Sequence, residues 1–101
     1  MSAPGALRDE GNGRYSLAGA VVLGSVAQLR EHALRAFGGS VGAIEVDLHA
    51  VERVDSGALA LLVDWLSWAR AAGRGMKFTA LPAALLALAR LSDVEDLLTG
   101  R

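Results

Sequence analysis

Three consecutive residues, Asp55-Ser56-Gly57, are the part of this sequence best suited to a chemical role. They stand where the alternating pattern of a strand gives way to helical spacing, which places the Ser56 hydroxyl near the free amides of a helix N-terminus. Either Ser56 or Asp55 can cap that helix, because both residue types are preferred caps. A phosphate on the hydroxyl would add about −1.5 to −2 charges to any docking surface there. We assign Asp55, Gly57 and Asp47 as residues that support Ser56.

The other candidates for catalysis or metal binding are weak. His32 and His49 lie in a predicted helix and a predicted loop, and no pattern brings either imidazole beside Ser56 as a base. Neither histidine has the spacing of an HExxH site, and the chain contains no cysteine. The glycine-rich run 38–42 lacks the Gly-Lys-Ser/Thr ending of a phosphate-binding loop and precedes a strand instead of a helix. We predict a protein that is not an enzyme and that holds no metal and no cofactor.

The charges of the chain are balanced and dispersed. Ten basic and eleven acidic residues give a formal net charge of −1, without the basic stripe that nucleic-acid binding needs. The longest uncharged apolar stretch, residues 80–89, is ten residues long, whereas a membrane span takes about 20. We expect a cytoplasmic protein that binds no nucleic acid and does not itself insert into a membrane.

The N-terminal elements follow from the apolar periodicity. Residues 1–12 have no period and are predicted to form a loose tail, followed by a single domain over residues 13–101. Residues 15–21 alternate between apolar and smaller or polar types, which indicates a first strand. We expect this strand to turn at Ala18-Gly19 into a short second strand over residues 20–23.

The next elements lead to the Ser56 junction. A first helix is predicted after Ser25, which forms a capping-box pattern with Gln28, and it ends at Gly38-Gly39. A central strand over residues 43–48 and a loop over residues 49–55 come next. The apolar stripe of the first helix is Val26, Leu29, Ala33 and Phe37.

A long helix over residues 56–72 then carries the second candidate site. At 100° per residue, one face of this helix is apolar and should lie on the sheet; it comprises Leu59, Leu62, Leu66 and Ala69. Leu61, Trp65 and Trp68 fall nearer the side of Asp64, and so much apolar surface beside a polar face predicts a partner-binding patch. Packing against a neighbouring helix is the alternative for the two tryptophans.

The C-terminal part completes the fold. A strand over residues 76–80, a helix over residues 82–91 and a short helix over residues 93–98 are predicted, the last with a capping box formed by Ser92 and Glu95. The strand–helix–strand units require parallel neighbours with right-handed crossovers. We therefore expect an α/β fold with a four- to five-stranded, mixed and mostly parallel sheet, and with four helices that lie mainly on one face.

Residues 14–98 resemble the STAS domain of anti-sigma factor antagonists and sulfate transporters. The resemblance is carried by Leu17-Ala18-Gly19, by Val46-Asp47-Leu48 and above all by the segment that opens the long helix, Val54-Asp55-Ser56-Gly57-Ala58-Leu59. It implies the STAS fold. In anti-sigma factor antagonists it implies that Ser56 is the regulatory site that an anti-sigma factor serine kinase phosphorylates.

The same segment is similar to the motif Val-Asp-Thr-Gly-Gly-Leu-Ala-Leu-Leu of the stand-alone, MlaB-like STAS subunits in the Mla phospholipid transport system of Gram-negative bacteria. This likeness implies that Ser56 corresponds to the functional threonine of those subunits. It also implies that the partner is the cytoplasmic ATPase of an ABC transporter, which would hold the chain at the inner membrane. A nucleotide- or lipid-binding module that uses the crevice near Asp47 and Ser56 is a further alternative.

Overall fold

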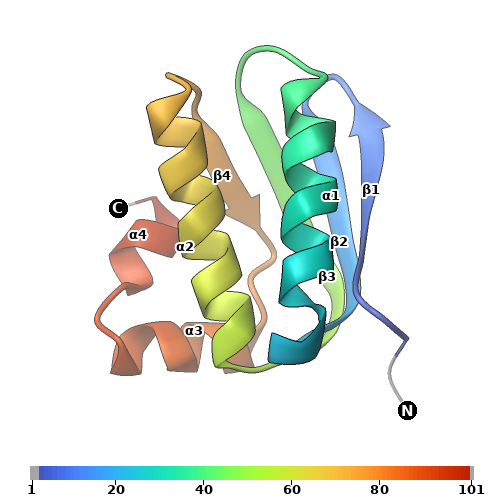
Figure 1. Ribbon diagram of the computed structural model, residues 1–101. Coiled ribbons are helices and arrows are strands. Elements are labelled where there is room, and N and C mark those ends of the chain that lie inside the picture. The colour runs from blue at the N-terminus through green and yellow to red at the C-terminus, as the bar shows by residue number, and fades with distance from the viewer. Residues whose placement is uncertain (1–2, 101) are drawn as a thin grey trace.

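The computed structural model describes residues 3–100 and has one four-stranded mixed sheet. The strands are β1 (Ala6–Gly11), β2 (Arg14–Val21), β3 (Ile44–Val54) and β4 (Met76–Thr79). They lie in the order β1-β2-β3-β4, with β1 antiparallel to β2 and the other neighbours parallel. The predicted α/β fold with a mixed, mostly parallel sheet is confirmed (Figure 1).

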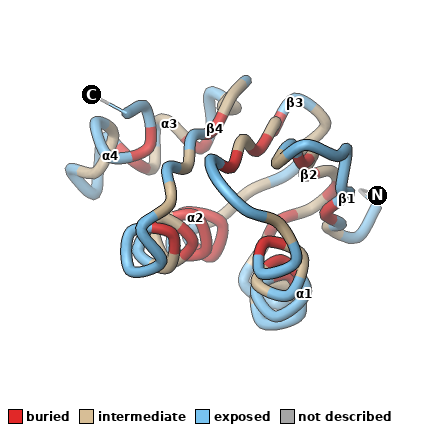
Figure 2. Tube along the Cα trace, turned by 90° about the horizontal axis from the view of Figure 1, so that it is seen from above, coloured by how far each residue is buried: buried red, intermediate tan, exposed pale blue. Residues whose placement is uncertain are grey.

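Two long helices cover one face of this sheet. The helical elements are the short 3-10 helix η1 (Leu23–Ser25), α1 (Val26–Gly38), α2 (Ser56–Ala71), α3 (Ala83–Leu91) and α4 (Glu95–Thr99). Figure 2 shows α1 and α2 side by side on the same side of the sheet, with α3 and α4 beyond β4 at its edge. The molecule therefore has one helix-covered sheet face and one face without helices.

The alternating strand residues explain the layering. On β2 and the first half of β3 every second residue is buried against the helices, including Leu17 and Val46, each with 0% of its surface exposed. The residues between them point to the open face, where Glu45 pairs with Arg14 at 3.8 Å and with Lys77 at 3.3 Å. The predicted apolar stripe of α1 is also buried, because Leu29, Ala33 and Phe37 all lie in the core while Val26 packs at its margin.

The strand predicted over residues 15–21 is found as β2, but two other N-terminal predictions were wrong. Residues 6–11 are not a loose tail but strand β1, which forms a hairpin with β2 around Asn12-Gly13. The φ angles of 56° at Asn12 and 78° at Gly13 suit the tight turn that matches the twist of two antiparallel strands. Ala18-Gly19 is not a turn, because β2 runs unbroken through it. Met1 and Ser2, which also belong to the predicted tail, lie outside the described residues.

Strand β3 is longer than predicted. It continues to Val54, so the predicted loop over residues 49–55 is reduced to Asp55 alone. The register between β2 and β3 shifts twice, between Ser16 and Ala18 and again between Gly19 and Ala20, and each shift inserts an extra residue into β3. Such bulges break the period-2 alternation, which is why this half of the strand has no strand-like pattern in the sequence.

Neither predicted capping box forms. The side chain of Ser25 makes no cap hydrogen bond to α1, and α4 begins after Val94 without a side-chain cap. Glu95 accepts a hydrogen bond from Arg90 Nε at 2.8 Å instead. Within residues 3–100, no helix has both the length and the apolar character that a membrane span requires.

Candidate functional site

Ser56 is the first residue of α2 and directly follows the carboxyl end of β3. In Figure 1 this junction lies at the lower end of the molecule, where η1 and α2 begin. Ligands and partners of α/β sheets commonly bind at this end of the strands. Ser56 is exposed, and no hydrogen bond of its hydroxyl is found within residues 3–100.

The cap of α2 is Asp55, not Ser56. Asp55 Oδ1 accepts a hydrogen bond from the backbone N–H of Gly57 at 2.7 Å. Both carboxylate oxygens of Asp55 also lie 3.1 Å from the backbone nitrogen of Leu23 and accept its N–H. One carboxylate thus satisfies an amide of the helix N-terminus and an amide of η1, and the Ser56 hydroxyl is left free for a partner.

Gly57 is required by the close approach of η1 to α2. A Cβ on this buried residue would lie 2.7 Å from both the nitrogen and the Cα of Leu23, and 2.9 Å from Asp55 Oδ1. These distances are too short for any side chain. In the triplet, Asp55 and Gly57 therefore hold the backbone in place, and Ser56 between them is the most exposed of the three residues.

The turn that packs on Gly57 is fixed by Ser25. The hydroxyl of Ser25 donates to the carbonyl oxygen of Val22 at 2.9 Å and accepts from the N–H of Val22 at 3.2 Å. This local pairing replaces the predicted capping box with Gln28. Leu23, in the same turn, has 72% of its surface exposed. Sequence reasoning did not identify Leu23 as part of the site.

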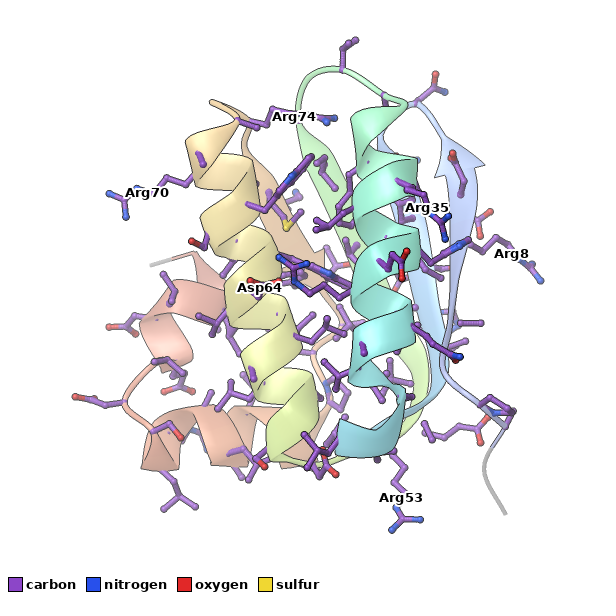
Figure 3. The ribbon with its side chains drawn as sticks, in the orientation of Figure 1. Arg8, Arg35, Arg53, Asp64, Arg70 and Arg74 are labelled. Carbon is purple, nitrogen blue, oxygen red and sulfur yellow. The ribbon has the colours of Figure 1, made fainter. Side chains whose placement is uncertain are left out.

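We call the exposed residues at this end the Ser56 face. It comprises the η1 residues Leu23 and Gly24 together with Ser56 and Ala60, which lie one turn apart on α2. Arg53 extends from the end of β3 away from the molecule at the same end (Figure 3). None of the four residues of the face carries a charge, and Gly24, Ser56 and Ala60 are small, so a partner surface can approach the backbone closely.

The predicted patch of Leu61 and Trp65 is wrong as an exposed surface. Leu61 is 1% exposed and Trp65 is 0% exposed. The indole of Trp65 meets the ring of Phe37 edge-on, with centroids 5.5 Å apart, and thereby joins α2 to α1. Helix α2 packs against α1 as well as the sheet, so two of its faces are buried, whereas the sequence analysis assumed one.

The other two members of that patch are engaged within the fold. Trp68 is half-buried, with its ring centroid 5.7 Å from that of Phe37 and 5.7 Å from the guanidinium carbon of Arg74. Asp64 accepts a hydrogen bond from Arg30 Nε across the α1–α2 boundary. The alternative for the tryptophans, packing against a neighbouring helix, describes both of them. Leu61 and Trp65 are therefore not available to a partner, whereas Trp68 and Asp64 stay partly exposed.

Asp47 does not support Ser56. Its carboxylate points to the open face of the sheet, where it accepts the backbone N–H of His49 at 2.9 Å and contacts His49 Nδ1 at 3.2 Å. Because β3 continues for seven residues beyond Asp47 at about 3.3 Å per residue, Ser56 lies roughly 20 Å or more further along the chain. The strand predicted to end at residue 48, followed by a loop over residues 49–55, had placed the two residues at one crevice, and the longer β3 is the cause of the error.

One hollow in the surface formed by residues 3–100 lies on the open face of the sheet, away from Ser56. This shallow depression of about 540 Å³ is lined by Arg8, Glu10, Ser16, Asp47 and His49, among others. Its charges are of mixed sign. Within the described part of the chain, no three acidic or histidine side chains are placed to hold a metal ion together.

Comparison with known families gives one match. A family model described as "Mlab, STAS domain" matches residues 6–99, which is nearly the whole chain. The match begins at the first residue of β1 and ends at the last residue of α4. No curated protein matches the chain significantly.

Proposed function

The chain belongs to the STAS domain family, and on that premise we propose that it is an adaptor that binds the cytoplasmic ATPase of an ABC-type phospholipid transporter. STAS domains are in general protein-interaction modules without catalytic activity. The Mlab description of the matching family supports the phospholipid transporter as the setting. In this role the chain is cytoplasmic and reaches the inner membrane through the ATPase.

The observation that carries the proposal is the isolation of the Ser56 hydroxyl. Its neighbours Asp55 and Gly57 are both committed to holding η1 against α2. The Ser56 hydroxyl makes no hydrogen bond within the described residues, although its backbone holds a fixed position in the Ser56 face. An exposed donor and acceptor on a rigid backbone is suited to a partner, because little freedom is lost when the partner binds.

The test is binding of the purified chain to the purified ATPase subunit of the phospholipid transporter from the same genome. We expect binding by the wild type and its loss in Ser56→Glu, because a carboxylate at the centre of the face would be desolvated without a counter-charge. Ser67→Glu is the matched control, since Ser67 is exposed on the same helix about 16 Å further along. Equal binding by all three proteins, each folded by circular dichroism, would contradict the proposal.

A phosphorylation switch of the anti-sigma type is the second candidate, favoured by the same accessible hydroxyl. A phosphate on Ser56 would stand beside the Asp55 carboxylate, which already occupies the amides of Gly57 and Leu23. The two negative groups would compete for these donors, so modification would loosen η1 as well as charge the surface. Phosphate on Ser56 in protein isolated from cells, together with a kinase partner, would favour this candidate over transport.

A further inference from the structure

Leu23 is an exposed apolar side chain on an unusually fixed backbone. Four large apolar side chains are strongly exposed within residues 3–100, namely Leu23, Val41, Leu91 and Leu97. Only Leu23 adjoins Ser56, because its backbone lies against Gly57. Its own N–H is bound by both oxygens of Asp55, 32 residues away in the sequence.

This fixation comes from three independent contacts. The Asp55 carboxylate binds the amide of Leu23, the missing side chain of Gly57 lets the turn pack on α2, and the Ser25 hydroxyl pairs with both backbone groups of Val22. A turn held in this way presents its side chain in one place. Ordering of loops and side chains is a main cost of protein association, and a preorganised turn avoids most of it.

The charges at the end of β3 indicate what kind of surface Leu23 fits. The Asp55 carboxylate contacts the Leu23 amide, and Glu52 and Arg53 are exposed at the end of β3, so this segment carries two acidic groups and one basic group. An anionic membrane or a nucleic acid requires an excess of cations, which these three residues do not provide. A protein surface with an apolar pocket and a rim of mixed charge is the complement of this arrangement.

We propose that Leu23 is the apolar anchor of the Ser56 face, that it inserts into an apolar pocket of the ATPase, and that Asp55 is the positioning residue that holds it there. The inference rests on the proposed function and adds the residues that give the interface its affinity. An aliphatic anchor in a pocket, surrounded by small residues such as Gly24 and Ala60, is the arrangement expected at the centre of a stable interface.

The experiment measures the dissociation constant of the ATPase complex by calorimetry. We expect Leu23→Ala to weaken binding about tenfold, as truncation of an anchor does. Val41→Ala is the matched control, because Val41 is 92% exposed in the loop between α1 and β3, at the opposite end of the molecule (Figure 1). If the wild type binds and Leu23→Ala binds equally well, the anchor role of Leu23 is overturned while the proposed function stands. If the wild type does not bind the ATPase, both are overturned.

The positioning role of Asp55 is tested on the free chain by hydrogen exchange. The amide of Leu23 should exchange slowly in the wild type and at least tenfold faster in Asp55→Asn, in which the remaining amide oxygen is a weaker acceptor than a carboxylate. The amide of Leu62, inside α2, reports global unfolding. Its exchange rate should differ between the two proteins only as much as their free energies of unfolding differ. Equal exchange at Leu23 in both proteins would overturn the positioning role whatever the binding result.

Discussion

The guanidinium of Arg74 lies over the ring of Trp68, with its central carbon 5.7 Å from the ring centroid. The same group donates to the carbonyl oxygens of Gly42 at 2.7 Å and Phe37 at 2.6 Å, and to the hydroxyl of Ser40 at 2.9 Å. Arg74 therefore joins the end of α2 to the loop that follows α1. Trp68 takes part in the packing of the fold, because its ring contacts both Phe37 and the cation of Arg74.

Replacing Arg74 by alanine should lower the free energy of unfolding by about 2–3 kcal/mol, because three hydrogen bonds from a charged group are lost and the Phe37 carbonyl stays partly buried. For a domain of this size, the melting temperature should fall by roughly 10–20 °C. Arg70→Ala is the control, since Arg70 points away from the molecule in Figure 3 and should change the melting temperature little. Similar melting temperatures for the two variants would contradict the role of Arg74 in joining the end of α2 to the loop that follows α1.

The two tryptophans should behave differently in fluorescence. Trp68→Phe leaves only Trp65, which is 0% exposed, so its emission should be blue-shifted and resist quenching by acrylamide. Trp65→Phe leaves the half-buried Trp68, which should be quenched more readily. Easy quenching of Trp65 would show that it lies on the surface, as the angular spacing along the helix predicted from sequence.

Truncation of Trp65 should be severe. Trp65→Ala should cost about 3–5 kcal/mol of unfolding free energy, because it leaves a large cavity between α2 and α1. Trp65→Phe should cost less, about 2 kcal/mol, since a six-membered aromatic ring still fills most of the space and the lost Nε1–H has no hydrogen-bond partner within the described residues. Urea unfolding of both variants measures this difference, and equal costs would contradict the packing described.

Gly57→Ala should destabilise the chain by about 1–3 kcal/mol, because its Cβ would overlap the backbone of Leu23 and force η1 away from α2. Gly38→Ala is the matched control: a Cβ at Gly38 meets nothing within 4 Å, and the residue is helical. Alanine there should be neutral or slightly stabilising. A Gly57→Ala variant as stable as the wild type would show that η1 is not packed on α2 as described.

The ion pair between Arg30 and Asp64 should contribute little. Their side chains are 50% and 40% exposed, and pairs of this kind typically couple by about 0.2–1 kcal/mol. A double-mutant cycle of Arg30→Ala and Asp64→Ala measures this coupling, which should shrink in high salt. A coupling of several kcal/mol that does not depend on salt would contradict the exposure of the pair.

Much of the fold could be predicted because the buried strands and helices carry clear periods. The bounds of α2 were predicted to within one residue, since Gly73 and the Ser56 junction mark its ends. Strand β1 was missed because only Leu7 in it is buried, so an edge strand has no alternation to detect. The Asn12-Gly13 dipeptide is a strong hairpin signal and was overlooked among charged residues.

The candidate site was located by its motif but not by its surroundings. The Asp55-Ser56-Gly57 triplet lies at the strand–helix junction as predicted, because the change of period marks that junction directly. Leu23 was not found, since its contact with this triplet spans 32 residues of sequence and depends on the absence of a side chain at Gly57. Trp65 was placed on the surface because a helical wheel cannot show that α1 packs on a second face of α2.

The most direct test of the docking surface is amide hydrogen exchange of the chain alone and in complex with the ATPase. We predict slower exchange on binding in the two segments that contain the Ser56 face, around η1 and in the first turns of α2, with little change in β1 and α4. Protection confined to the open sheet face or to α4, with unchanged exchange around Leu23 and Ser56, would contradict the central claim.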